Sequence, residues 1–483
     1  MKKIKIIGLY ATLLFSVVAC KKDLDINRNP YLPSEATPKL LLPSGIAYSA
    51  SRIGGDIQLI GSIWSQHYTQ NNTSNQYRSL DQYTVGIADY NPIWTNLYGG
   101  ALKDLDLAKN MAKTAGQWNY YLPASIMQVF DYHVLVDLYS QIPYTEGLQG
   151  DANTAPKWEE GKAVNTKLIA QLDDAISKSA DAIALPPIGT EDFLFQGDMT
   201  QWVKFAKTLK LKILMRDFAA NQAAIQQLVT EGDLLSTRDA KMTAFVDLEN
   251  KSNPLYEYDR RKLNTFFNLK ASKTLLSYLT TNNDPRLTDF FEKTVTGTYL
   301  GLAQGDFNAT GLLANQTSRA VLAATDAVYF TSAAESKFLQ AEAWARIGNV
   351  AQAKARYDEA VTLSFSRWSK DATPFIAATG AYAFKSATTE QMIQSIITQK
   401  WIAATRCQAW DSFFDQNRTG YPVVSTVGPT DPTYVPGRYT VSVNTSLVAG
   451  ELPRRLLYPK ISSDNNVNTP AAVSINTKMW WHK

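Results

Sequence analysis

The chain has 483 residues, 45% apolar and 11% aromatic, and its formal net charge is +4. Three lysines among the first nineteen residues supply most of that charge, because the remainder holds 45 basic and 44 acidic side chains. Binding to phosphate backbones needs clustered Lys and Arg, and here these residues occur only in short runs, so nucleic-acid binding is excluded.

Residues 1–19 have the layout of a secretory signal, with early lysines and then an apolar run over 4–18 that is too short to span a bilayer. The run ends in Val17-Val18-Ala19-Cys20, which resembles a bacterial lipobox, so we expect Cys20 to carry lipid and to become the mature N-terminus. The alternative is a cysteine that follows the signal by chance. With Cys20 modified, Cys407 is the only thiol left and no internal disulfide can form.

Residues 20–45 predict an extended tether, because four prolines disfavour helix in the residues before them. The remainder, 46–483, predicts one large domain, since no linker or low-complexity tract divides it. Apolar residues spaced three to four positions apart predict a mainly helical chain. The expected helices cover 46–68, 90–112, 121–139, 167–183, 201–220, 223–231, 271–279 and 389–411, with a loop-rich stretch at about 245–330 and an irregular C-terminal cap at 412–483.

The segment 334–361 predicts two short amphipathic helices joined at Gly348. Alanines at the facing positions allow the two backbones to approach, and Trp344 and Tyr357 are expected to fill the core beside the contact. Glu342 is the charged residue on the inner face of the first helix. The pattern is typical of a tetratricopeptide-like helix pair, which cannot bury its inner face alone and therefore requires further pairs. An isolated hairpin within another fold is the alternative.

The chain offers little that could carry catalysis. It contains three histidines and none of the zinc-protease, serine-hydrolase or phosphate-loop motifs. His133 and Asp137 lie one helical turn apart and could form a metal or acid–base pair, but no third ligand is near in sequence, so a buried hydrogen bond between them is expected. Residues 464–468 lack the glycine and the closing glutamate of a calcium loop. We predict no metal, no cofactor and no enzymatic activity, while a surface-anchored glycoside hydrolase stays an alternative because its two acids need no motif.

Several stretches occur in a characteristic order along the chain. They are the lipobox, DLYSQIPYTEGLQG at 137–150, NPLYEY at 253–258, NDPRL at 283–287, the 334–361 hairpin and PRRLLYP at 453–459. Together they resemble the SusD/RagB family of outer-membrane lipoproteins of Bacteroidota. The resemblance covers nearly the whole chain and favours a SusD-like branch distinct from the founding starch binder.

The resemblance implies a SusD-like, mainly α fold in which tetratricopeptide-like helix pairs form one compact unit with a loop-rich ligand-binding face. It implies a lipid-anchored outer-membrane protein, exposed at the cell surface, that binds an oligomeric nutrient and delivers it to a SusC-like TonB-dependent barrel transporter. The ligand is an oligosaccharide or a peptide, and the protein does not alter it. A helical-repeat scaffold that holds another protein is a further alternative.

No ligand-contacting residue carries over from the family, because ligand contacts in it follow no fixed motif. Aromatic faces stack on sugar rings or peptide side chains, and polar groups satisfy hydroxyls or amides. The loops 69–83 and 299–308 are rich in both kinds of side chain, and an ordinary surface is the alternative. The candidate ligand-binding residues are Tyr77, Arg78, Tyr83, Tyr299, Asp306 and Phe307.

Overall fold

The computed structural model describes residues 36–263, 268–448 and 450–483. The signal segment, Cys20 and most of the expected tether lie outside these residues. Three short antiparallel strand pairs accompany the helices: β1 (Tyr68–Gln70) with β5 (Leu269–Ala271), β2 (Gln141–Ile142) with β3 (Glu159–Glu160), and β4 (Ala240–Met242) with β6 (Val328–Thr331).

The described chain is mainly helical, as predicted. In order, its α-helices are α2 (Pro38–Arg52), α3 (Gln58–Trp64), α4 (Arg78–Gln82), α5 (Asn91–Asn96), α6 (Lys103–Thr114), α7 (Trp118–Tyr139), α8 (Gly161–Ser177), α9 (Ser179–Ala184), α10 (Met199–Leu214), α11 (Phe218–Glu231), α12 (Pro254–Tyr256), α13 (Lys273–Thr281), α14 (Leu287–Phe290), α15 (Ala333–Ile347), α16 (Val350–Ser366), α17 (Thr373–Ile376), α18 (Thr389–Ala403), α19 (Ala409–Thr419) and α20 (Lys460–Asn465).

The longest of these helices, α7, lies at the centre of one helix layer. Nearly all of its 22 residues are buried, because α6, α8 and α10 pack around it. A helix that is apolar on all sides is expected in such a position. Among the described residues, no helix combines the length and the apolar character needed to cross a membrane.

The hairpin of α15 and α16 has the predicted geometry. Gly348 ends α15 with a left-handed φ of 92°, and the Asn349 side chain accepts a hydrogen bond from the Gln352 backbone N–H at 3.1 Å to start α16. Tyr357 is fully buried, as predicted, whereas Trp344 is only partly buried at the edge of α15. Because α15 also packs on α11 and α18, the hairpin is one of several helix pairs and not an isolated one.

Two predicted boundaries were wrong. The predicted tether reaches residue 45, but α2 begins at Pro38, since proline is favoured in the first turn of a helix. The helix predicted over 389–411 breaks after α18. Arg406 adopts a left-handed φ of 58° there, and its guanidinium binds Asp326 at 2.6 Å, so a partner distant in sequence fixes the break.

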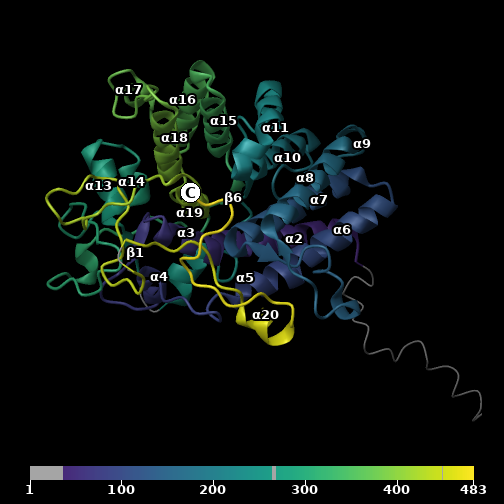
Figure 1. The fold of residues 1–483 in the computed structure, drawn as a ribbon, viewed down its shortest axis with the longest axis horizontal. Coiled ribbons are helices and arrows are strands. Elements are labelled where there is room, and N and C mark those ends of the chain that lie inside the picture. Colours follow the sequence, from purple (N-terminus) through teal and green to yellow (C-terminus); the bar gives the residue numbers. More distant parts are fainter. Residues whose placement is uncertain (1–35, 264–267, 449) are drawn as a thin grey trace, which may run out of the picture.

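The helices and the loops lie on different sides of the molecule (Figure 1). Helices α6 to α11 form one side, and the hairpin with α18 stands beside them. The loop-rich part of the chain, with α13, α14 and β1, lies on the opposite side together with much of the C-terminal segment. The junction between α18 and this loop-rich side holds the candidate site.

Candidate functional site

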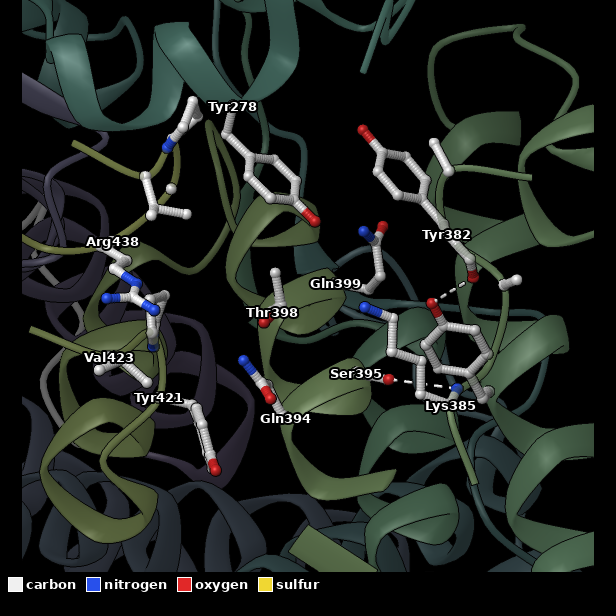
Figure 2. Close-up of a pocket in the computed structure, with 17 residues that line it drawn as sticks. Tyr278, Tyr382, Lys385, Gln394, Ser395, Thr398, Gln399, Tyr421, Val423 and Arg438 are labelled. Carbon is white, nitrogen blue, oxygen red and sulfur yellow. Dashed lines mark hydrogen bonds between the residues drawn. The ribbon is translucent and has the colours of Figure 1, made fainter. Parts of the chain in front are cut away.

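A cleft of about 270 Å³ lies where α18 meets α13, the loop 381–385 and the C-terminal segment 421–438 (Figure 2). These four stretches are far apart in the sequence. Their side chains in the cleft include Tyr278, Tyr382 and Tyr421, and Tyr357 of α16 adds a fourth tyrosine.

Two of these tyrosine rings are held parallel. The rings of Tyr278 and Tyr382 are 4° from parallel, and their centroids are 6.1 Å apart. The Tyr382 hydroxyl donates a hydrogen bond to Asp284 at 2.7 Å, and the Tyr357 hydroxyl donates to the Tyr382 carbonyl at 2.7 Å. Burial and the Asp284 carboxylate raise the pKa of Tyr382, so its hydroxyl remains a donor at neutral pH. The aromatic wall is therefore built into the fold.

Beneath this wall, Asp284 is held by a buried arginine. Arg286 donates to both Asp284 oxygens, at 3.0 and 2.6 Å, and both side chains are fully buried. Arg286 also donates to Ser364 at 2.7 Å, and its guanidinium lies 4.0 Å from the centre of the Phe365 ring. Burial opposes ionisation of Asp284, but the arginine lowers the pKa of this carboxyl below its usual value. The ion pair thus connects the Tyr382 loop to α16.

A glycine lets the C-terminal segment pack on the aromatic wall. Gly437 has a φ of 84°, and a Cβ atom at this position would lie 2.3 Å from the Tyr278 ring. Only glycine adopts this left-handed conformation readily and also leaves room for the Tyr278 ring.

Polar and charged side chains also line the cleft, beside apolar residues such as Val423 and Val435. Gln394 and Thr398 lie one turn apart on α18, and Lys385 and Arg438 stand on opposite sides of them (Figure 2). No hydrogen bond or ion pair to the rest of the described chain engages these four side chains. Positions 394, 395 and 398 form a polar face on an amphipathic helix, which the sequence shows, but the residues across the cleft could not be read from the sequence.

The two loops chosen from the sequence do meet, although they share no lining residue with the cleft. The Gln304 amide donates to the buried Asp81 carboxylate at 2.5 Å, which joins one loop to the other. The Arg78 guanidinium lies 4.3 Å from the centre of the Phe307 ring, and Asp306 beside it is half-buried. The structure therefore brings Arg78, Asp306 and Phe307 together as a polar and aromatic face, here called the loop face.

The three predicted tyrosines lie elsewhere. Tyr77 is 8% exposed and Tyr83 is 4% exposed, and both pack in the main hydrophobic core. Their ring faces are covered by protein, so their role in this structure is packing. Tyr299 is half-buried and lies beside Lys293, whose ammonium is 5.9 Å from its ring centre.

The other candidate groups from the sequence are structural. His133 Nε2 and Asp137 Oδ2 are 3.3 Å apart and buried, but the predicted hydrogen bond between them is absent, because Asp137 accepts from Arg216, at 2.6 Å for the shortest bond. Burial lowers the pKa of His133 to about 4, so the ring is neutral. Within the described ranges, no three His, Cys, Asp or Glu side chains are grouped as metal ligands would be. Burial raises the pKa of the Cys407 thiol to about 12, which makes it unreactive.

A second cavity, of about 460 Å³, lies beside the last residues of the chain. Its cationic side chains are already engaged, because Arg216 binds Asp137 and Arg418 binds Glu342 at 2.5 Å. The indole N–H of Trp481 is enclosed by protein atoms and is not accessible from the cavity. The cleft on α18 is the better candidate, since four of its polar side chains, Lys385, Gln394, Thr398 and Arg438, are at least partly exposed and have no hydrogen bond to the described chain.

Comparison with known proteins identifies the family. The SusD-like family model described as "starch-binding associating with outer membrane" matches residues 32–441. A SusD homolog from Bacteroides uniformis has a TM-score of 0.75 and 23% identity, covering 92% of this chain and 99% of that one. A chitin-binding SusD homolog from Flavobacterium johnsoniae has a TM-score of 0.72 and 20% identity, covering 91% and 98%. No curated protein sequence matches the chain.

The two solved structures agree with the fold over nearly their whole length, and the family model spans the hairpin, α18 and most of the cleft. SusD-like proteins are non-catalytic binding proteins. The chain therefore belongs to the SusD-like family of binding proteins associated with the outer membrane.

Proposed function

We propose that the protein binds an oligosaccharide nutrient in the α18 cleft and delivers it, chemically unaltered, to a SusC-like TonB-dependent transporter. The observation that carries this proposal is the lining of the cleft, which combines held tyrosine rings with free amide and hydroxyl groups. Aromatic faces stack on the apolar faces of sugars, and amides and hydroxyls pair with sugar hydroxyls. The description of the family and the chitin-binding homolog support a glycan over a peptide.

Tyr278 is the ring that we expect to make the main contact. It is half-buried, whereas Tyr382 behind it is almost fully buried. Gln394 and Thr398 are close enough to each other, one helical turn apart, to bind neighbouring hydroxyls of one sugar chain.

The lining of the cleft also argues against hydrolysis. A glycoside hydrolase needs two carboxylic acids on either side of the bond that it cleaves. No Asp or Glu lines the cleft. The bound oligosaccharide should therefore leave the protein intact.

Attachment to the membrane is proposed to occur through lipid on Cys20. The loop face of Arg78, Asp306 and Phe307 is proposed as a second contact surface, for a longer ligand or for the transporter. It offers one cation above one aromatic ring, so its ligand contacts would be fewer than those in the cleft.

Isothermal titration calorimetry tests the binding site. Purified residues 21–483 are titrated with the oligosaccharide that binds most strongly on a glycan array. Tyr278→Ala should weaken binding by about tenfold or more, as loss of an aromatic hot spot does, and Gln394→Ala should weaken it less. Phe307→Ala is the matched control, because it removes an aromatic ring from the loop face. If Phe307→Ala abolishes binding while Tyr278→Ala leaves it unchanged, the ligand binds the loop face and not the cleft.

Delivery is tested by purification of the full-length protein from membranes in mild detergent. A TonB-dependent barrel should be recovered with it in near-equal amount. Recovery of the protein alone, under conditions that preserve a reference transporter complex, would contradict delivery. Recovery with a different soluble protein would favour the scaffold alternative.

A further inference from the structure

We infer that the α18 cleft is selective for acidic oligosaccharides, with carboxylate or sulfate groups of the sugar bound by Lys385 on one side and by Arg438 on the other. This inference rests on the proposed function, because it names the class of oligosaccharide that the same cleft takes. It is carried by the distribution of charge around the cleft.

The charged side chains of the cleft all have one sign. Lys385 and Arg438 line it, and no aspartate or glutamate does. The chain as a whole is nearly balanced after its first nineteen residues, with 45 basic and 44 acidic side chains. A cleft that holds two cations and no acid therefore departs from the average surface of this protein.

The nearest carboxylates do not neutralise these two cations. Glu390, on the first turn of α18, binds Lys483 at 3.0 Å and accepts a hydrogen bond from the Tyr421 hydroxyl at 2.9 Å. Asp284, behind the aromatic wall, is bound by Arg286. Both of these carboxylates therefore have partners other than Lys385 and Arg438.

Each cation is attached to a wall that the fold holds in place. Arg438 follows Gly437, which packs directly on the Tyr278 ring. Lys385 lies three residues after Tyr382, and its backbone N–H donates to Ser395 on α18 at 3.4 Å. The two side chains stand on opposite sides of Gln394 and Thr398 (Figure 2).

An anionic group between these walls would form hydrogen bonds to charged donors, which are roughly twice as strong as neutral ones. The attraction would also act over about 10 Å in dilute salt and weaken as salt rises. A neutral sugar would leave both cations in the cleft without a counter-charge. The preference should therefore follow the charge of the ligand and not its length.

The test uses pairs of oligosaccharides that differ only in charge. One pair is an oligogalacturonide and its fully methyl-esterified form, and the other is a sulfated glucan oligosaccharide and its desulfated form. Titration of residues 21–483 should show the acidic member of at least one pair binding about tenfold more tightly than its neutral counterpart. The first pair tests a carboxylate and the second a sulfate, so the two arms identify which anion is bound.

Variants assign the preference to the two cations. Lys385→Gln with Arg438→Gln should remove the preference, because the affinity for the acidic member should fall to that of the neutral member, and both residues are exposed, so folding is not expected to suffer. Lys251→Gln removes an exposed lysine that does not line the cleft and should keep the preference. Raising salt from about 0.05 to 0.5 M should weaken only the acidic ligand.

The outcomes separate this inference from the proposed function. Equal affinity for the acidic and neutral members, or a preference that survives the double variant, overturns the inference while oligosaccharide binding stands. Failure of every oligosaccharide to bind overturns both. An acidic peptide that binds as tightly as the acidic sugar would show that the anion is recognised without the saccharide, which also contradicts the inference.

Discussion

Replacement of Glu342 by glutamine should destabilise the fold strongly, because this carboxylate joins the hairpin to α19. Glu342 is 1% exposed and lies between two arginines. Arg418 of α19 donates to its two oxygens at 2.5 and 2.7 Å, and Arg346 donates at 2.8 Å. Glutamine keeps the shape of the side chain but removes the charge, so Arg418 is left buried with Asp415 as its remaining carboxylate partner.

The magnitude follows from the pKa of this carboxyl. Burial alone would raise the pKa of Glu342, but Arg418 and then Arg346 lower it from 4.5 to about 2. Each unit of difference between the folded and unfolded chain corresponds to about 1.4 kcal/mol, so the charged form contributes about 3 kcal/mol at neutral pH. Removal of one partner from a buried ion pair typically costs about 3 to 5 kcal/mol, and the value obtained from the pKa agrees with this range.

The sign of the pH dependence is also fixed. Because the folded pKa lies below the unfolded one, the stabilisation is complete above about pH 4.5 and is lost as the pH falls toward 2. The difference in free energy of unfolding between the natural protein and Glu342→Gln should therefore shrink to less than half at about pH 3.

Urea unfolding of residues 21–483, followed by circular dichroism at about pH 7 and pH 3, measures this difference. Glu359→Gln is the control, since Glu359 also binds cations but its side chain is 42% exposed, and it should cost at most about 1 kcal/mol. A cost for Glu342→Gln that is equally small, or that does not change with pH, would refute the reasoning.

Three further predictions concern the cleft and the anchor. Tyr357→Phe removes the hydrogen bond to the Tyr382 carbonyl and should lower the free energy of unfolding by about 1 kcal/mol in urea, and unchanged stability would contradict a structural role for that bond. Gly437→Ala should displace the Tyr278 ring and weaken oligosaccharide binding measured by titration calorimetry, so an unchanged affinity would show that the ring position does not matter. Cys20→Ala should abolish incorporation of labelled fatty acid in the cell, and continued labelling would disprove the proposed anchor.

Much of the helical scaffold could be predicted because its signals are local. The hairpin is encoded by small residues at contact positions and by Gly348, whose conformation few other residues adopt. The break after α18 could not be predicted, because Arg406 takes its left-handed conformation with the help of Asp326, some eighty residues away in the sequence. The residues next to Arg406 in the sequence give no indication of its contact with Asp326.

The candidate site was less predictable than the scaffold for a similar reason. The candidate loops were predicted from their content of aromatic and polar residues. Composition does not show which ring faces are covered by protein, and Tyr77 and Tyr83 are core residues. The cleft combines Tyr278, Tyr382 and the polar face of α18, which come together only in the folded chain. Glu342 could be recognised from the sequence as the charge on an inner helix face, but its partner Arg418 could not.

Calorimetric titration of residues 21–483 with a single oligosaccharide, combined with chromatography of that oligosaccharide after long incubation, tests the central claim most directly. We predict saturable binding that is weakened about tenfold or more by Tyr278→Ala, in a variant that circular dichroism shows to be folded, and recovery of the oligosaccharide intact. Cleavage products that increase with time and protein concentration, or binding that is indifferent to Tyr278→Ala, would contradict it.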